Sequence, residues 1–172
     1  MLKKILGLLG IIVGLLLLIP LILSSKMLVT RSAEMQVSAS SLHSYLADLN
    51  HYPSWNPFSE NDPGATNQIT GAGVGSVLTW KGDKTGEGKM TITQIQPNQS
   101  IHLALDFYTP MEGHALIEWK TEAIDATKSR LTWSMDQDLS YFHRYIGLFM
   151  NGMIGKTFDR GLLNLKKKIE KA

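Results

Sequence analysis

The sequence predicts an α+β fold in which a long C-terminal helix covers one face of an antiparallel β-sheet. Between residues 68 and 135, short segments with every second residue apolar are separated by turn residues, which is typical of antiparallel strands. A strand and a short helix precede these segments, and this order indicates an α+β domain. From residue 141 to residue 170, apolar side chains recur mostly every three or four residues, as on one stripe of a helix: Phe142, Ile146, Phe149, Met153, Phe158, Leu162, Leu165 and Ile169.

Length and charge limit the number of domains and the class of partner. The chain has 172 residues, which is room for one domain and a short appendage. Lys3 and Lys4 precede an apolar run, and without them 15 basic side chains stand against 15 acidic ones. Because no basic surplus remains to neutralise a phosphate backbone, we expect no nucleic-acid partner. The absence of cysteine excludes disulfides, thiolate metal sites and cysteine nucleophiles.

The N-terminal segment predicts a membrane anchor. Residues 5–23 are uncharged, and 15 of these 19 are Leu, Ile or Val. As a helix this segment would be about 28 Å long, close to the hydrocarbon thickness of a bilayer. We therefore expect a single transmembrane helix within residues 1–25 and one domain over residues 26–172.

A cleaved signal peptide is the alternative for this segment. Lys3, Lys4 and the serines at 24 and 25 favour cleavage, whereas the long apolar run and the lack of an Ala-x-Ala site oppose it. The N-terminal lysines slightly outweigh Lys26 and Arg31. By the positive-inside rule, we expect a cytoplasmic N-terminus and a domain on the extracytoplasmic side of the membrane.

The first part of the domain predicts a strand, a short helix and a loop. Residues 27–37 alternate between apolar and polar side chains, as in a half-buried strand. Residues 38–41 offer serine caps for a short amphipathic helix that follows. Prolines within residues 50–67 indicate a loop, and we expect its two large aromatic residues, Trp55 and Phe58, to be tucked beneath it.

Five further segments predict strands of a meander. Residues 75–81 and 90–92 show a hairpin pattern around a glycine-rich turn. Residues 101–108 give the clearest alternation in the chain, and two more strands are expected around residues 115–119 and 131–135. Such a sheet has one apolar face, which a long helix can cover.

The terminal helix carries signals at both of its ends and unusual glycines inside. Three lysines at 166–168 suit a helix C-terminus, and Asp138 and Ser140 are candidate N-caps. Gly147, Gly152, Gly155 and Gly161 each weaken a helix by roughly 1 kcal/mol against alanine, so we expect a sheet or a ligand to approach closely. The alternative is that the helix breaks in two near residues 152–155.

No catalytic, metal-binding or cofactor-binding motif stands out. The glycines at 71, 73 and 75 precede a strand and lack a Walker lysine, so they do not predict a phosphate loop. The five histidines have no paired metal spacing, and no serine lies in a nucleophile motif. We therefore expect no metal, no cofactor and no catalytic residue.

The candidate site is the apolar inner surface of the sheet and helix. A dry core would explain these aromatic residues equally well, but the glycines of the facing helix favour a cavity. The predicted cavity-lining residues are Trp55, Phe58, Trp80, Leu103, Leu105, Phe107, Trp119, Trp133, Phe149, Gly152 and Met153.

Four stretches together resemble the SRPBCC, or START-like, superfamily, in particular its polyketide cyclase/dehydrase and lipid-transport branch. They are residues 52–58, 73–76, 130–135 and 158–166, read in this order and spacing. The resemblance covers nearly all of the chain after about residue 30. It implies a helix-grip fold, in which a curved antiparallel sheet wraps around the C-terminal helix. It also implies a deep cavity for a hydrophobic small molecule such as a lipid, isoprenoid or polycyclic aromatic.

Three functional hypotheses follow. The first is a membrane-anchored binding module that holds a hydrophobic ligand, and we favour it over enzymatic activity because no catalytic signature is visible. The second is a cyclase or dehydratase acting on such a ligand, which would need local bulges to turn polar strand residues inward: His102, His114, Tyr108 or Asp106. The third is a protein-interaction domain with a filled core.

Overall fold

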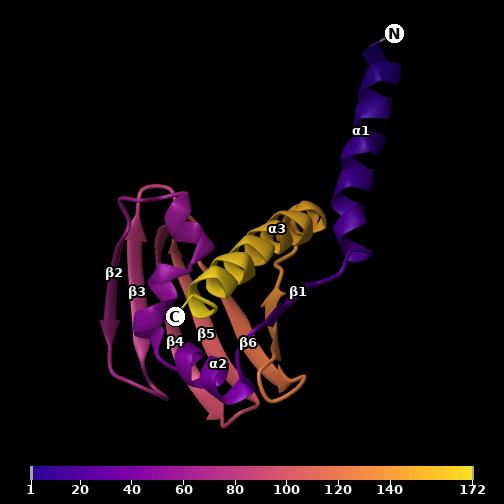
Figure 1. Cartoon of the computed structure of the whole chain (residues 1–172). Coiled ribbons are helices and arrows are strands. Elements are labelled where there is room, and N and C mark those ends of the chain that lie inside the picture. The colour runs from indigo at the N-terminus through magenta and orange to yellow at the C-terminus, as the bar shows by residue number, and fades with distance from the viewer. Residues whose placement is uncertain (1, 172) are drawn as a thin grey trace.

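Seven antiparallel strands form one sheet in the computed structural model, which describes residues 2–171. The strand order is β1-β7-β6-β5-β4-β3-β2, and the long helix α3 crosses one face of the sheet (Figure 1). The expected α+β class is confirmed. The helices are α1 (Leu2–Leu18), α2 (Ala39–Leu46) and α3 (His143–Ile169), with 3-10 turns η1 (Ile19–Leu21), η2 (Leu49–Ser54) and η3 (Pro57–Glu60). The strands are β1 (Lys26–Met35), β2 (Thr66–Thr70), β3 (Val77–Gly82), β4 (Gly86–Gln96), β5 (Ser100–Thr109), β6 (Gly113–Ala123) and β7 (Ser129–Asp138).

The first and the last strand of the chain are neighbours in the sheet. β1 pairs with β7 from Lys26 opposite Asp138 to Met35 opposite Ser129. The other strands pair with their sequence neighbours, as the turn signals predict. As a result, the residue before β1 and the residue after β7 lie at the same end of the sheet, where α3 also begins.

The loop predicted over residues 50–67 contains η2, η3 and the start of β2. Trp55 is 2% exposed and packs under this segment, as expected. Phe58 differs from the expectation, because it is 37% exposed. The turn η3 begins at Pro57, whose fixed backbone suits the first position of a helical turn, and it leaves Phe58 at the edge of the domain.

The helix α3 is continuous, and the alternative of a break near residues 152–155 is wrong. Neither predicted cap closes its N-terminus. Asp138 is the last residue of β7, and the N-cap position is Phe142, without a side-chain cap. The Ser140 hydroxyl instead lies 2.7 Å from Nδ1 of His143.

Only the second half of α3 is buried against the sheet, which corrects the expectation of one buried stripe. Phe158, Leu162 and Leu165 are at most 2% exposed, whereas Phe149 is 79% exposed and Met153 is 62% exposed. Figure 1 shows the start of α3 reaching past the sheet edge toward α1. The three-to-four spacing defines the apolar stripe correctly, but it carries no information on how far the sheet extends beneath it.

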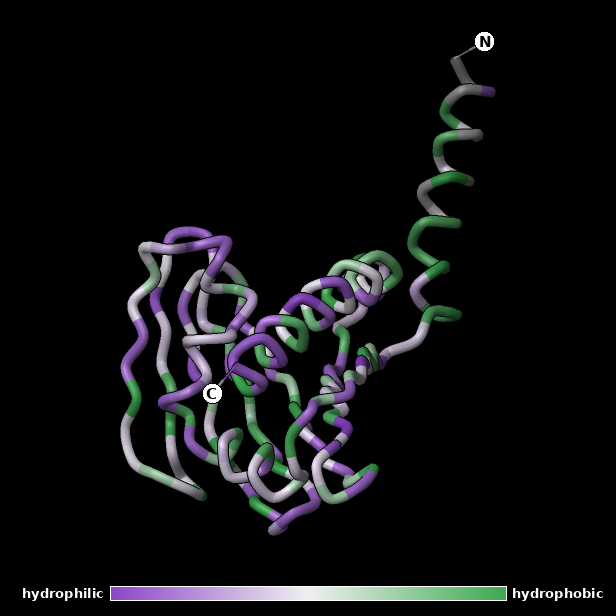
Figure 2. The backbone as a smooth tube through the Cα atoms, in the orientation of Figure 1, coloured by the Kyte–Doolittle hydropathy of each residue, from purple (hydrophilic) through white to green (hydrophobic). Residues whose placement is uncertain are grey.

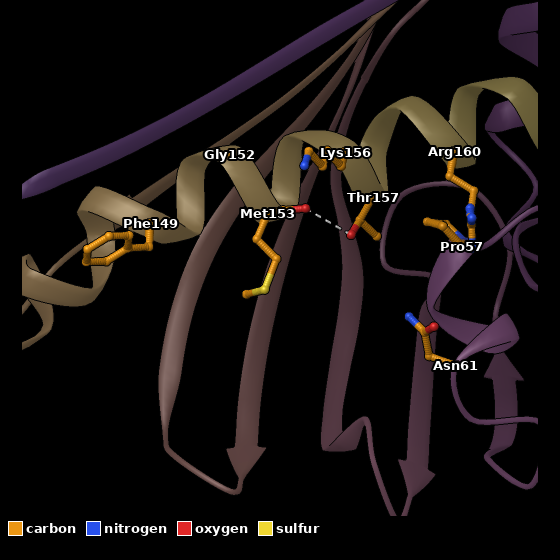
Figure 3. Close-up of a pocket in the computed structure, with 8 residues that line it drawn as sticks. All are labelled: Pro57, Asn61, Phe149, Gly152, Met153, Lys156, Thr157 and Arg160. Carbon is orange, nitrogen blue, oxygen red and sulfur yellow. Dashed lines mark hydrogen bonds between the residues drawn. The ribbon is translucent and has the colours of Figure 1, made fainter.

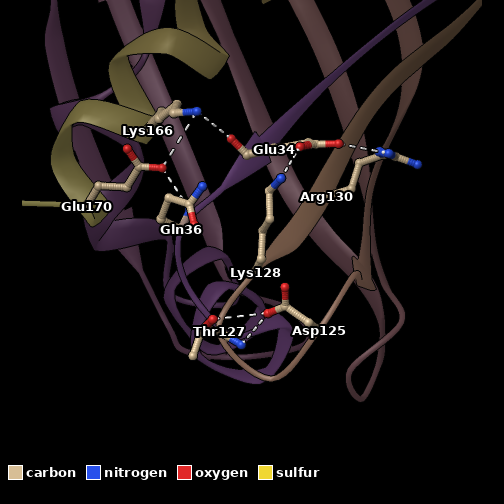
Figure 4. A network of polar contacts seen from close by, with 8 residues as sticks. All are labelled: Glu34, Gln36, Asp125, Thr127, Lys128, Arg130, Lys166 and Glu170. Atoms are coloured by element: carbon tan, nitrogen blue, oxygen red, sulfur yellow. Dashed lines mark hydrogen bonds and ion pairs between the residues drawn. The ribbon is translucent and has the colours of Figure 1, made fainter.

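Polar contacts fix the C-terminal end of α3 to the far end of β1 (Figure 4). The Lys166 ammonium donates to the backbone carbonyl of Glu34 at 2.9 Å, and the Glu170 carboxylate accepts from the backbone N–H of Gln36 at 2.7 Å. Lys128, and then Arg130, lower the pKa of the Glu34 carboxyl through hydrogen bonds. The helix is therefore held at its second half by both apolar and polar contacts.

Two glycines of α3 allow this close packing, and a third does not take part in it. A Cβ atom at Gly161 would lie 2.8 Å from the ring of Trp133, and one at Gly155 would overlap the Arg31 guanidinium. A Cβ at Gly152 would meet nothing within 4 Å. Close approach of the sheet thus explains Gly155 and Gly161 but not Gly152.

The apolar N-terminal segment forms α1, which extends away from the domain beyond the start of α3 (Figures 1 and 2). It ends at Leu18, and the 3-10 turn η1, which contains Pro20, follows. Proline interrupts an α-helix because it lacks the N–H group. Within residues 2–171, no helix is sufficiently long and apolar to cross a membrane. The transmembrane helix expected over residues 5–23 is therefore not supported.

We predict opposite effects for alanine at two glycines of α3. Gly152→Ala should raise the free energy of unfolding by up to about 1 kcal/mol, because the helix gains propensity and no atom is in the way. Gly161→Ala should lower it by on the order of 1 kcal/mol, because overpacking against Trp133 exceeds that gain. Urea unfolding of both variants checks this, and a stabilised Gly161→Ala would contradict the close packing.

Candidate ligand-binding cavity

A cavity with a volume of about 630 Å³ lies between the sheet and the first half of α3. This volume falls in the usual range for small-molecule sites. Its buried walls are apolar or aromatic: Tyr52, Leu78, Met90, Ile117, Trp133, Met135 and Phe158. Exposed polar residues, among them Asn61, Lys84, Glu112 and Asp138, line its outer edge. The interior therefore suits an apolar ligand, and the edge can hydrogen-bond to water or to a polar group.

The cavity exists because α3 rests on the sheet only through its second half. The ring of Phe158 stacks on Trp133 with centroids 4.0 Å apart, and this contact forms the inner end of the cavity. One and two turns earlier along the helix, Ile154 and Met150 line the cavity roof. The space between this roof and the strands below is not filled by side chains.

Six of the predicted site residues line this cavity: Phe58, Trp80, Leu105, Phe107, Trp133 and Met153. Trp80 and Phe107 meet edge to face with centroids 5.9 Å apart, and they come from β3 and β5. The sheet alternation indicates which face of each strand these side chains occupy. That alternation brings the four strand residues to the inner face, where they meet Met153 from α3 and Phe58 from η3.

Three predicted residues belong to a filled part of the core instead. Trp55, Leu103 and Trp119 are at most 2% exposed and do not line the cavity. Trp55 lies 5.5 Å from Trp119 and 5.5 Å from Trp133 between ring centroids. These rings close the inner end of the space, so the protein has both a dry aromatic core and a cavity beside it.

The remaining two predicted residues, Phe149 and Gly152, line a second, outer groove of about 570 Å³ (Figure 3). Met153 and Asn61 line both the groove and the cavity, so the two spaces adjoin. Lys156 and Arg160 follow along the same helix and also line the groove. Phe149 and Gly152 thus lie outside the internal cavity because α3 extends beyond the sheet at this point.

Several lining residues were not among the predicted ones: Met90, Ile117, Met135, Met150 and Ile154. Ile117 and Met135 share the strand phase of Trp119 and Trp133, so the alternation carried a signal for them. Met90 also alternates with polar neighbours in its strand. Met150 and Ile154 fall between the positions of the exposed helical stripe, and only the tilt of α3 over the sheet brings them onto the cavity.

Asp62 shapes the cavity edge by holding the turn between β3 and β4. Its carboxylate accepts hydrogen bonds from the amides of Lys84 and Thr85 at 2.8 and 2.9 Å, and from the Thr85 hydroxyl at 3.0 Å. The amides of Thr85 and Lys84 lower the pKa of this carboxyl below its ordinary value of 3.8. The Thr85 carbonyl in turn accepts from the Trp80 indole at 3.3 Å. A chain of contacts therefore runs from Asp62 to an aromatic wall of the cavity.

Tyr52 contributes a polar group within the buried walls. It is 7% exposed, and burial raises the pKa of its hydroxyl. The side chain consequently remains a neutral phenol, which can donate one hydrogen bond and accept another. Tyr52 can orient a ligand that is otherwise held by apolar contacts.

The four residues considered for catalysis do not line the cavity: His102, His114, Tyr108 and Asp106. Asp106 accepts from Nδ1 of His114 at 2.7 Å, with Lys89 at 3.6 Å, and these contacts lower the pKa of the Asp106 carboxyl, His114 most. This group alternates with the lining residues Leu105 and Phe107, so it lies on the outer face of the sheet. Among the described residues, no three His, Cys, Asp or Glu side chains are grouped so that they could hold a metal ion.

One polar pair does belong to the cavity lining. Ser140 and His143, at the start of α3, lie 2.7 Å apart between the hydroxyl and Nδ1. Both are at the outer edge, where Ser140 is exposed. The two residues are only three positions apart, so the contact also serves the start of the helix.

A family model for polyketide cyclase/dehydrase and lipid transport matches residues 26–170. The chain belongs to this family. The match begins with β1 and ends one residue after α3, so it includes every element that builds the cavity. The expected membership in the SRPBCC superfamily is confirmed.

Solved structures share the fold at low sequence identity. The Zhui aromatase/cyclase from Streptomyces sp. R1128 is 18% identical, with a TM-score of 0.61 and coverage of 85% of this chain and 94% of that chain. A point mutant of norcoclaurine synthase from Thalictrum flavum is 13% identical, with a TM-score of 0.61 and coverage of 83% and 96%. The Aha1 dimer from Colwellia psychrerythraea is 17% identical, with a TM-score of 0.59 and coverage of 83% and 96%.

These similarities support the helix-grip fold, and at such identities they show the fold alone. A comparison with curated protein sequences gives no match. The residues of the cavity therefore carry the argument on function.

We predict that Asp62→Asn loosens the turn at the cavity edge in a pH-dependent manner. The folded-state pKa of Asp62 is depressed, so its charge stabilises the fold above the unfolded-state pKa, and this contribution disappears as the pH falls through the folded-state pKa. Wild type should therefore exceed Asp62→Asn in unfolding free energy near about pH 7, and the difference should shrink below about pH 4. Urea unfolding across this range measures it. A difference that stays constant with pH would show that the charge of Asp62 does not contribute.

Proposed function

We propose that the domain binds a hydrophobic small molecule in the cavity between α3 and the sheet. The observation that carries the proposal is the cavity of about 630 Å³ whose buried walls are apolar or aromatic. A lipid, an isoprenoid or a polycyclic aromatic has the chemistry for such a site. Membership in a family that includes lipid transport supports the same class of ligand.

Apolar burial supplies the binding energy. Each methylene moved from water into such a site contributes about 0.8 kcal/mol, so a chain of roughly ten gives about 8 kcal/mol before the costs of association. The Tyr52 hydroxyl can pair with one polar atom of the ligand inside the cavity. The ligand that fits best is therefore mostly apolar, and a polar group on it can pair with Tyr52 or with the polar residues at the cavity edge.

We predict that filling the cavity weakens binding without unfolding the domain. Leu105→Trp should weaken binding of an anthroyloxy-labelled fatty acid by about tenfold or more, because the indole would occupy ligand volume. Leu116→Trp is the matched control, because Leu116 is on the neighbouring strand but is 56% exposed and does not line the cavity. Fluorescence titration measures both affinities, and circular dichroism checks the fold.

Equal affinities of the two tryptophan variants would exclude this cavity as the binding site. Mass spectrometry of molecules extracted from the purified full chain gives the identity of any bound ligand. A wild-type protein that contains no apolar molecule and ignores the labelled fatty acid would contradict the proposal.

The proposal includes a location at a membrane. The exposed leucines and isoleucines of α1 and η1 form an apolar segment directly before the domain, and a bilayer would remove their side chains from water. Lys3 and Lys4 precede this segment, so we propose that the N-terminus is cytoplasmic and that the domain is on the extracytoplasmic side. Because α1 by itself ends at Leu18, such a crossing requires η1 and the residues up to Leu23 as well.

We predict that charges on α1 release the chain from membranes. The double variant Leu9→Asp, Leu16→Asp should leave the membrane pellet after cell fractionation, since each aspartate in hydrocarbon is unfavourable by about 3 kcal/mol. Leu163→Asp on α3 is the control, because Leu163 is 51% exposed while Leu9 and Leu16 are 54% and 52% exposed. Wild type and the control should remain in the pellet. A wild-type chain that is absent from the membrane pellet after the same fractionation would contradict membrane attachment.

The second candidate function is an enzyme that acts on the bound molecule. One observation favours it, namely the 2.7 Å contact between Ser140 and His143 at the cavity edge. A serine hydroxyl bonded to a histidine nitrogen can transfer a proton. Incubation of the full chain with its extracted ligand distinguishes the two functions, because an enzyme would return a chemically changed molecule and a binding module would not.

A further inference from the structure

Large apolar side chains surround the opening of the cavity. Met111, Ile146 and Met153 line the cavity and are also 57%, 44% and 62% exposed, so they mark its opening to solvent. Phe142, at the N-cap of α3, and Phe149, in its first half, do not line the cavity, but they are 67% and 79% exposed. We call these five residues the apolar rim. Single exposed apolar residues are ordinary on a protein surface, but a group of large ones around an opening indicates an interaction surface.

The apolar rim is continuous with α1. The hydroxyls of Tyr141 and Tyr145 donate to the carbonyls of Leu17 and Leu16 in the last turns of α1, and the Arg144 guanidinium donates to the Pro20 carbonyl at 2.9 Å. A helix leaves its last carbonyls without partners, so these donors complete the end of α1. They also hold the apolar N-terminal helix beside the residues of the rim, and Figure 1 shows both at the same end of the domain.

Cationic side chains lie behind the rim. Lys156 and Arg160 line the outer groove together with Phe149 and Met153. The side chains of Phe149 and Met153 leave α3 on the same side (Figure 3). Arg160 contacts Glu60 at 3.1 Å. Because Glu60 already pairs with Arg160, Lys156 is the cation of this pair that suits a phosphate. Apolar side chains next to such a cation match the layers of a lipid surface, in which acyl chains lie beneath anionic phosphates.

We propose that the apolar rim docks on the surface of a lipid bilayer, so that the cavity opens directly onto the acyl chains. This inference rests on the proposed function, because an opening onto acyl chains serves a cavity that binds a hydrophobic ligand. The docking itself requires no ligand. A bilayer is the occupant that also accommodates α1, because the apolar rim and α1 are both apolar and meet at the start of α3. Tyr141 and Tyr145 have apolar rings and polar hydroxyls, which suit the interfacial layer between the acyl chains and water. A hydrophobic ligand could then enter the cavity without crossing water.

The absence of cysteine allows a direct test on the full chain. Phe149→Cys is labelled with the polarity-sensitive fluorophore NBD and reconstituted in vesicles of phosphatidylcholine and phosphatidylglycerol that contain spin-labelled lipids. Leu163→Cys is the matched control, because Leu163 is also an exposed apolar residue of α3. The two positions are about 21 Å apart along the helix axis. Docking through the rim should quench the label at 149 strongly and the label at 163 little.

Several outcomes would overturn the proposal. Equal quenching at the two positions would mean that α3 lies flat on the bilayer or that the labels bind lipid by themselves. No quenching at either position would mean that the rim does not meet lipid, which is the result expected if a protein partner covers it. Strong quenching at 149 in a protein that binds no labelled fatty acid would support the docking and count against the proposed function alone.

The second variant tests the consequence of docking. Phe149→Ser together with Phe142→Ser, two rim residues that do not line the cavity, should slow the transfer of the labelled fatty acid from the full chain to acceptor vesicles by about tenfold. Its equilibrium affinity should remain unchanged if the rim acts on entry and exit alone. A transfer rate equal to that of wild type would contradict a role for the rim in ligand exchange.

Discussion

The stack of Phe158 on Trp133 sets the spacing between helix and sheet. Its ring centroids are 4.0 Å apart, and Gly161 allows the helix backbone to come this close. From this contact toward the C-terminus, α3 is buried and fixed by apolar and polar contacts. Toward the N-terminus the helix contacts β1 through Gly155 and Asn151, and the cavity separates it from the strands that line this space. The same contact therefore separates the part of the molecule that provides stability from the part that can admit a ligand.

Stability and binding are thus assigned to different halves of one helix. The aromatic group of Trp55, Trp119 and Trp133 buries large rings at the closed end, where packing leaves no room for a ligand. The open end is lined by methionine and isoleucine side chains, whose flexible or branched ends adapt to ligands of varied shape.

The fold could be predicted from sequence because each strand and helix carries a local pattern. The alternation in β5 and the three-to-four spacing in α3 suffice to assign both elements and their inner faces. The site could be predicted only in part, since alternation gives the face of a side chain but not its depth. Leu103 and Leu105 share one phase of β5, yet Leu103 lies in the dry core and Leu105 lines the cavity. Phe149 follows the helical stripe as well as Phe158 does, and only the limited extent of the sheet beneath α3 separates their surroundings.

The pairing of the first strand with the last one has a consequence for the order in which the domain is made. Thr30 and Ser134 face each other across β1 and β7, although 104 residues separate them in the chain. During synthesis, β1 leaves the ribosome early and must wait for nearly the whole chain before its partner exists. Contacts between such distant residues also slow folding, because a long loop has to close first. The nascent protein therefore carries its apolar N-terminal segment and an unpaired strand for most of its synthesis, and the domain is completed only after residue 138 has emerged.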